Sequence, residues 1–364
     1  MMSLNGKCIP PSMNPECSPR SSVSESLAQL DIEERYDIIK ELGSGTYGKV
    51  LLGECRDTQT KVALKVLPKK NTKYRDFQRE FCYSYYFSPH EAIIKTYDFA
   101  FETMESYVFA QEYAPLGDLF EAITPQIGLG EEICKRVMRQ IASALEFMHS
   151  KSLAHRDVKP ENILCFDHNL TRIKLIDFGM TRKVGTMVRK TSGSIPYTPP
   201  EVCEAVRNER YSVETSADVW ACVVLLFCTL TGNFPWEHAH RKDIYYVEFL
   251  NWQRRKTTKV PSQWRKFSPR LLKLFRKMLE PCPDKRSSIK EIHKYFSDTW
   301  VQVKEGGNAE ECNNDVGYDD DDVYSHGSNT HMAELAAILN SQGIETKVNK
   351  KLRERRICEW LLST

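Results

Sequence analysis

One short stretch in the middle of the chain constrains its fold and chemistry more than any other feature. Residues 155–162 contain the pattern H-R-D-x-K-x-x-N, and the triplet Asp177-Phe178-Gly179 follows shortly after. Five fixed residues arise by chance in a chain of 364 residues about once in ten thousand sequences, if each residue type has a usage of about 1/20. An incidental polar loop does not explain why the second motif follows the first. We therefore expect a functional site built from both motifs.

A glycine-rich segment lies far upstream and has the pattern G-x-G-x-x-G-x-V. Because glycine lacks a Cβ, its backbone amides can approach phosphate oxygens closely. An ordinary glycine hairpin is the alternative, and a dinucleotide-binding turn would continue into a helix. A strand-like run follows here instead, so we expect a strand–loop–strand unit that covers phosphates. Its residues are Leu42, Gly43, Ser44, Gly45, Thr46, Tyr47, Gly48, Lys49 and Val50.

A lysine, Lys65, lies within the apolar run that begins with Val62-Ala63-Leu64. An ammonium group in a dry site needs an anionic partner, which phosphates or a carboxylate can supply. Glu80 is the best carboxylate candidate, because it lies on a predicted helix over residues 74–86. The alternative is a surface lysine whose ammonium reaches water. The position after the glycine-rich segment favours the buried, paired lysine.

The apolar pattern divides the folded region into two parts. Residues 51–67 and 107–113 are typical of strands, whereas residues 133–149 and 219–230 are typical of helices. The run over residues 219–230 is too short to span a membrane and predicts a buried helix. We therefore predict an α+β fold with two lobes, a small β-rich N-terminal lobe and a larger helical C-terminal lobe.

Composition changes at both ends of this region. Residues 1–35 are rich in proline and serine and predict a flexible leader, so the folded domain is expected over residues 36–300. Residues 301–364 begin with an acidic linker that contains Asp319 to Asp322 and end in a basic, amphipathic tail. That tail could dock on the aspartates or on the domain as a self-regulatory element. The alternative is a solvated helix or a disordered tail.

The overall composition excludes several classes of protein. Hydrophobic residues make up 41% and charged residues 27%, and the net charge is +2, so no global field would recruit nucleic acid or an anionic membrane. The 12 cysteines are scattered without a C-x-x-C pair, and no apolar signal segment opens the sequence. We expect free cysteines in a reducing compartment, hence a cytoplasmic protein, and we expect a monomer.

The motifs together resemble the protein kinase superfamily over roughly residues 36–300. The resemblance implies a bilobal protein kinase fold that transfers the γ-phosphoryl group of ATP, with Mg²⁺, to Ser or Thr hydroxyls of protein substrates. Asp157 would accept the proton of the substrate hydroxyl, and Lys159 would neutralise charge on the transferring group. Asn162 and Asp177 would hold Mg²⁺ through hard oxygen ligands.

The same resemblance implies how the nucleotide is held. The glycine-rich segment would cover the phosphates, and Lys65 would bind the α- and β-phosphates. Backbone groups of Glu112 and Ala114 would bind adenine at the hinge, where Gln111 would guard the back pocket. Asp118 would meet the ribose or a basic residue of the substrate.

Other features follow or depart from the kinase pattern. Asp218 opens the apolar helix and would accept hydrogen bonds from catalytic-loop amides, although a simple helix cap is the alternative. Pro199 replaces the usual alanine before Pro200-Glu201, but Glu201 can still pair with Arg286. Ser84 is smaller than the apolar residue expected on its helix face, which predicts looser packing.

Lysine at position 159 is typical of serine/threonine kinases. A phosphate on Thr186, Thr191 or Ser192 could dock on Arg156 and order the preceding loop, although the basic residues around these hydroxyls could equally be a solvated face. Several stretches, among them residues 113–120 and 225–236, resemble the Src-homology-3-binding-domain kinases (the SBK group). A proline-rich tail is absent from this sequence, so that binding property is not carried over.

Two alternatives to an active kinase are less consistent with the sequence. A catalytically dead pseudokinase scaffold usually lacks one of Lys65, Asp157, Asn162 or Asp177, and all four are present. A small-molecule phosphotransferase of the same fold is disfavoured by the peptide-docking segment, residues 193–201. The sequence does not identify the protein substrates.

Overall fold

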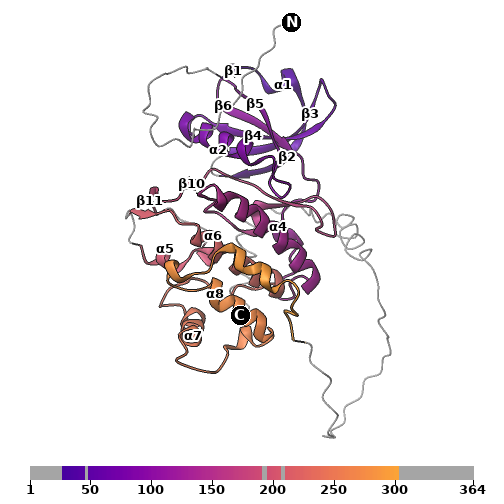
Figure 1. Ribbon diagram of the computed structural model, residues 1–364. Coiled ribbons are helices and arrows are strands. Elements are labelled where there is room, and N and C mark those ends of the chain that lie inside the picture. Colours follow the sequence, from indigo (N-terminus) through magenta and orange to yellow (C-terminus); the bar gives the residue numbers. More distant parts are fainter. Residues whose placement is uncertain (1–26, 46–47, 191–194, 206–209, 303–364) are drawn as a thin grey trace, which may run out of the picture. The chain divides into compact units, whose positions relative to one another are not determined.

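The computed structural model describes residues 27–45, 48–190, 195–205 and 210–302 (Figure 1). The acidic linker and basic tail were predicted for residues 301–364, of which residues 303–364 lie outside the described residues, as do Thr46 and Tyr47. The described chain forms a β-rich N-terminal lobe and a helical C-terminal lobe, which confirms the predicted α+β fold.

The N-terminal lobe contains a six-stranded sheet with the strand order β1-β5-β6-β4-β3-β2. All neighbouring pairs are antiparallel except β1 and β5. The strands are β1 (Ala28–Gln29), β2 (Tyr36–Gly45), β3 (Gly48–Cys55), β4 (Lys61–Pro68), β5 (Thr96–Glu102) and β6 (Ser106–Glu112).

The alternation of buried side chains along β4 determines the face of the sheet from which the Lys65 side chain projects. Val62, Leu64 and Val66 are buried in one apolar cluster, at 4%, 0% and 4% exposure. Because successive side chains of a strand point to opposite faces, Lys65 leaves this cluster on the other side of the sheet. That face meets α2 (Tyr74–Phe87), where Phe81 packs 5.6 Å from the Phe109 ring of β6. The helix predicted for residues 74–86 is confirmed and is one residue longer.

The segment just before β2 differs from its prediction. The sequence predicts a flexible leader up to residue 35, but β1 pairs with β5 in parallel and α1 (Ile32–Arg35) follows. Leu30 and Ile32 pack on the apolar cluster of the sheet, and Leu30 N donates to Glu102 O at 2.9 Å. The expected leader is therefore wrong for these residues, because apolar side chains anchor them. Residues 1–26 lie outside the described part of the chain.

The C-terminal lobe is built around two long helices, α4 (Glu131–Ser150) and α6 (Ser216–Thr231). Both predicted helices are confirmed and extend by a few residues at their ends. Helix α6 is buried from Asp218 to Thr231, which explains why its sequence is apolar on every face. Gly232 ends it with a φ of 66°. The other helices are α3 (Leu119–Ala122), α5 (Pro200–Glu204), α7 (Ile244–Gln253) and α8 (Pro269–Met278).

Short strands connect the helices around the site. They form three two-stranded pairs, β7 with β10, β8 with β9, and β11 with β12. Among the described helices, none is long and apolar enough to cross a membrane. The strands are β7 (Leu153–Ala154), β8 (Ile163–Cys165), β9 (Ile173–Leu175), β10 (Arg182–Lys183), β11 (Met187–Arg189) and β12 (Arg210–Ser212).

The end of the domain is fixed to the first turn of α4. Glu131 accepts hydrogen bonds from the backbone amides of Trp300 and Val301, both at 2.9 Å, and pairs with Lys135 at 2.7 Å. Trp300 is fully buried. The chain is therefore held against the lobe up to Val301.

Candidate active site

Three charged side chains from three elements meet between the sheet and the C-terminal lobe. Lys65 of β4 donates a close hydrogen bond to Glu80 of α2, and its Nζ lies 3.3 Å from Oδ1 of Asp177. The side chains of Lys65 and Glu80 are 19% and 11% exposed, whereas that of Asp177 is 40% exposed. The structure thus brings together the lysine and the glutamate that the sequence paired, with the aspartate of the second motif beside them.

The charges in this group shift its pKa values in definite directions. Burial alone would lower the pKa of Lys65, but the carboxylates of Asp177 and Glu80 raise it above its usual range. The charge of Lys65 lowers the pKa of Asp177, against the effect of burial. Near neutral pH the lysine is therefore cationic and Asp177 is an anion.

A second group is formed by the catalytic loop. Asp157 Oδ2 accepts from Lys159 Nζ at 2.8 Å and from Asn162 Nδ2 at 2.8 Å. Asn162 Nδ2 also donates to the backbone carbonyl of Asp157 at 2.8 Å. Because the amide nitrogen of Asn162 bonds to Asp157, the amide oxygen is the atom of this side chain that would bind a ligand. The three residues all belong to the H-R-D-x-K-x-x-N motif, residues 155–162, which we call the catalytic loop.

A buried carboxylate holds this loop in an unusual backbone conformation. Arg156 has a φ of 71°, a region that residues other than glycine seldom adopt. Asp218 accepts from the backbone amides of Arg156 at 2.7 Å and His155 at 2.8 Å, and from His149 Nε2 at 2.9 Å. Burial would raise the pKa of Asp218, but these donors lower it. The predicted contact between Asp218 and the loop amides is confirmed.

Asp177 also has an unusual backbone conformation, with a φ of 66°. Phe178, the next residue, is fully buried and lies 5.3 Å from the ring of Phe87 and 5.3 Å from the ring of His155. This aromatic column joins the catalytic loop to the end of α2. Phe87 therefore provides apolar contact one turn beyond Ser84, which is itself only 1% exposed.

The described residues of the glycine-rich segment lie at the end of β2 and at the start of β3. Gly48 has a φ of 150°, and a Cβ at this position would lie 2.3 Å from Val66 O, so only glycine fits. A Cβ on Gly43 or Gly45 would meet nothing within 4 Å. Leu42, Ser44 and Lys49 are exposed, and Val50 is partly buried. This part of the segment leaves its backbone accessible.

The hinge side chain of Glu112 has partners that the sequence did not predict. Glu112 accepts a close hydrogen bond from Lys174 of β9, bonds to Arg172 at 3.0 Å and accepts from Lys95 N at 2.7 Å. Lys174 is only 7% exposed. These ion pairs link the end of β6 to the β8–β9 hairpin. They leave the backbone carbonyl of Glu112, the group assigned to adenine, outside this interaction.

Two further residues with predicted ligand contacts, Ala114 for adenine and Asp118 for the ribose or the substrate, are buried. Ala114 is 9% exposed and Asp118 is 5% exposed. The Asp118 carboxylate accepts from Glu121 N at 3.2 Å and caps α3. A contact between Asp118 and a ribose or a basic substrate residue stays a prediction.

The donor set fits a nucleotide triphosphate with Mg²⁺. Mg²⁺ is usually held by one or two carboxylates together with phosphate oxygens, rather than by a cage of protein ligands. Asp177 is a partly exposed anion. The amide nitrogen of Asn162 bonds to Asp157, so its amide oxygen is the atom that would bind Mg²⁺. Among the described residues, no group of three or more His, Cys, Asp and Glu side chains could hold a metal alone. Lys65 adds a cation at the same place.

The pairing between Glu201 and Arg286 is present. Arg286 donates to both carboxylate oxygens of Glu201, each at 2.9 Å, and to Ser216 O at 2.9 Å. Its side chain is fully buried and lies 4.9 Å from the Trp220 ring. Pro199, the departure from the usual alanine, precedes α5 as its N-cap residue.

Comparison with known proteins agrees with this site. The sequence pattern of the protein kinase domain matches residues 36–297. Serine/threonine-protein kinase SBK1 of Danio rerio is 50% identical over 285 residues, which cover 78% of this chain and 74% of that protein. Serine/threonine-protein kinase meng-po of Drosophila melanogaster is 39% identical over 92% of this chain and 75% of its own length. Serine/threonine-protein kinase SBK2 of Rattus norvegicus is 40% identical over 80% and 81%.

The chain therefore belongs to the protein kinase family. Its fold, its two motifs and the extent of the match all agree on this class. Within the family it is a serine/threonine kinase of the SBK group, as the sequence resemblance predicted. Nothing in these comparisons supports the pseudokinase alternative.

Proposed function

We propose that this serine/threonine kinase uses the two hydrogen-bonded groups of its site in different roles. Asp157 orients the acceptor hydroxyl and accepts its proton, while Lys159 neutralises charge on the transferring phosphoryl group. Lys65, held by Glu80, binds the α- and β-phosphates. The observation that carries this proposal is the convergence of Lys65, Glu80 and Asp177, which come from three separate elements.

Asn162 and Asp177 would hold Mg²⁺. The metal, when bound, neutralises negative charge on the phosphate oxygens. The protein contributes mainly by positioning and by preorganised charge, because phosphoryl transfer demands little covalent chemistry from it. The Lys159 ammonium, 2.8 Å from Asp157, is already in place beside the proton acceptor.

Nucleotide binding by the full-length chain tests the metal assignment. We expect ATP with Mg²⁺ to raise the unfolding free energy by about 2.7 kcal/mol at a ligand concentration of 100 times Kd. Asp177→Asn should abolish the part of this gain that requires Mg²⁺, because the amide lacks the charge that attracts the ion. Thermal unfolding with ATP alone, with ATP and Mg²⁺, and with EDTA measures the difference. An equal Mg²⁺-dependent gain in both proteins would contradict the assignment.

A second proposal concerns control of the site by phosphorylation. Arg156 donates to Met180 O at 3.0 Å and to the Tyr211 hydroxyl at 2.9 Å. Burial and the charges of Arg79 and Arg156 lower the pKa of Arg182 to about 10. Such a concentration of positive charge suits a phosphate group. Thr186 is exposed nearby, whereas Thr191 and Ser192 lie outside the described residues.

We expect at least one of Thr186, Thr191 and Ser192 to carry phosphate in active enzyme. Phosphatase treatment should then lower peptide phosphorylation, because the arginines lose the anion that offsets their mutual repulsion. Mass spectrometry of the active protein before and after treatment measures this. Full activity with none of the three modified would remove the proposal.

The remaining assignments are broader. The substrates of protein kinases are proteins, and we infer that this chain acts as a cytoplasmic monomer without a nucleic-acid partner. The support is the near-neutral charge and the scattered cysteines of the sequence. Light scattering of the purified chain and microscopy of a tagged chain in cells would check these inferences.

A further inference from the structure

A chain of polar contacts runs behind the adenine end of the site. Thr96, the first residue of β5, is 2% exposed and stands opposite Gln111 in the β5–β6 register. Gln111 Nε2 donates to the Thr96 hydroxyl at 3.0 Å. Gln111 directly precedes the hinge residue Glu112. One end of the polar chain therefore lies at the wall assigned to adenine.

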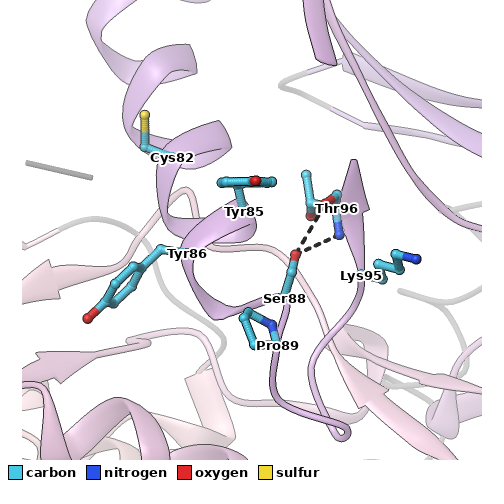
Figure 2. A pocket seen from close by; sticks show the side chains of 7 residues that line it. All are labelled: Cys82, Tyr85, Tyr86, Ser88, Pro89, Lys95 and Thr96. Atoms are coloured by element: carbon cyan, nitrogen blue, oxygen red, sulfur yellow. Dashed lines mark hydrogen bonds between the residues drawn. The ribbon is translucent and has the colours of Figure 1, made fainter. Parts of the chain in front are cut away.

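The other end lies at the C-terminus of α2 (Figure 2). Thr96 N donates to the Ser88 hydroxyl at 2.7 Å, and Ser88 Oγ donates to Ser84 O at 2.9 Å. Ser88 is the C-cap residue of α2, and Ser84 is buried one turn before it. Four residues, Ser84, Ser88, Thr96 and Gln111, thus form a continuous set of hydrogen bonds, which we name the Thr96 relay.

The Thr96 relay ends on the helix that carries Glu80. Glu80 lies one turn before Ser84 on α2 and holds Lys65. A shift of the end of α2 would move Glu80 and separate this pair. The relay thus joins the residue beside the hinge to the helix that positions the phosphate-binding lysine.

Packing alone does not fix this side of the helix. A cavity of about 510 Å³ opens between the end of α2 and the start of β5, and Tyr85, Ser88 and Thr96 contribute to its wall (Figure 2). The aromatic column of Phe87 and Phe178 supports the helix elsewhere. Thr96 and Ser84 are nevertheless 2% and 1% exposed, so their hydrogen bonds lie away from water, where each bond is electrostatically stronger.

We propose that Thr96 is a positioning residue for phosphoryl transfer. Its hydroxyl holds the Gln111 side chain and its backbone amide holds Ser88 at the end of α2, so that Thr96 couples Gln111 to the Glu80–Lys65 pair. This inference rests on the proposed function, because it assigns Lys65 to the ATP phosphates. It predicts that the hydroxyl matters more than the methyl group of Thr96. The two properties can be separated by a matched pair of substitutions.

Thr96→Val keeps the shape and removes the hydroxyl, whereas Thr96→Ser keeps the hydroxyl and removes the methyl group. We expect Thr96→Val to weaken binding of ATP with Mg²⁺ and to lower kcat, each by about 3–10-fold, the range of one lost hydrogen bond. Thr96→Ser should stay within about twofold of wild type, and KM for the peptide should not change. Calorimetric titration with ATP and Mg²⁺ gives the affinity and the active fraction, which separates an altered site from a partly unfolded protein.

Ser88→Ala cuts the relay at its other bond and serves as a second variant if Thr96→Val folds poorly. We expect the double variant to be no weaker than the worse single one, because both remove the same coupling. Equal losses in Thr96→Ser and Thr96→Val, or unchanged affinity and kcat in Thr96→Val and Ser88→Ala, would overturn the relay while wild type stays active. A wild-type chain that neither binds ATP with Mg²⁺ nor transfers phosphate would instead overturn the proposed function, and the relay with it.

Discussion

Replacing Asp157 with asparagine should lower kcat by about 10²–10⁴-fold, the usual contribution of a positioned proton acceptor. The amide keeps the size of the side chain but cannot take up the proton of the acceptor hydroxyl. It also loses the negative charge that faces Lys159 at 2.8 Å. Affinity for ATP with Mg²⁺ should change much less, because Lys65 and Asp177 are untouched. Initial rates of peptide phosphorylation, together with nucleotide titration, measure both quantities.

Asp98→Asn provides the matched control, since Asp98 is exposed on β5 and far from the catalytic loop in sequence. It removes the same charge and should leave kcat within about twofold, as surface substitutions usually have small effects. An Asp157→Asn enzyme as fast as this control would remove Asp157 from its assigned role. A loss of nucleotide binding as large as the loss of kcat would instead indicate damage to the whole site.

Arg286→Met should lower the free energy of unfolding by about 3 kcal/mol, the lower end of the range for breaking a buried ion pair. Methionine replaces much of the apolar stem but none of the donors. Glu201 then loses both of its bonds to the guanidinium, and the carbonyls of Ser216 and Glu280 lose theirs, at 2.9 and 2.8 Å. Denaturant unfolding followed by tryptophan fluorescence measures the change, because Trp220 lies next to Arg286.

Arg270→Met is the corresponding change on the surface. Arg270 also bonds to a carboxylate, Asp298 at 2.8 Å, but its side chain is 50% exposed. An exposed pair of this kind contributes about 0–1 kcal/mol, so the control should be nearly neutral. Equal destabilisation by the two substitutions would show that burial of Arg286 does not decide its contribution.

The local pattern of apolar residues was sufficient to predict much of the fold. Apolar residues recur at helical spacing over residues 133–149, so a helix buries them on one face. Residues 219–230 are apolar throughout, and the helix that contains them is buried on all sides. The pair of Lys65 and Glu80 was also predictable, since a lysine in an apolar run requires a carboxylate or phosphate. The helices were predictable from residues that are near one another in the sequence. The ion pair was predictable because a buried lysine needs an anionic partner.

Other contacts were not predictable because they join distant residues with no distinctive local pattern. Glu112 meets Lys174 across 62 positions, and either residue alone is typical of a solvated surface. The bond between Gln111 and Thr96 depends on the strand register, which hydrophobic alternation did not specify. The short strand β1 has only two residues, too few to show any alternation.

Strand β1 also bears on where this domain physically begins. The kinase pattern starts at residue 36, yet the chain before it already pairs with β5, the strand that would otherwise end the sheet. An uncovered outer strand offers unpaired amides and carbonyls to other molecules and promotes aggregation. Strand β1 pairs with Phe101 and Glu102 of β5, so a fragment cut at the sequence boundary would expose the backbone groups of these two residues to other molecules.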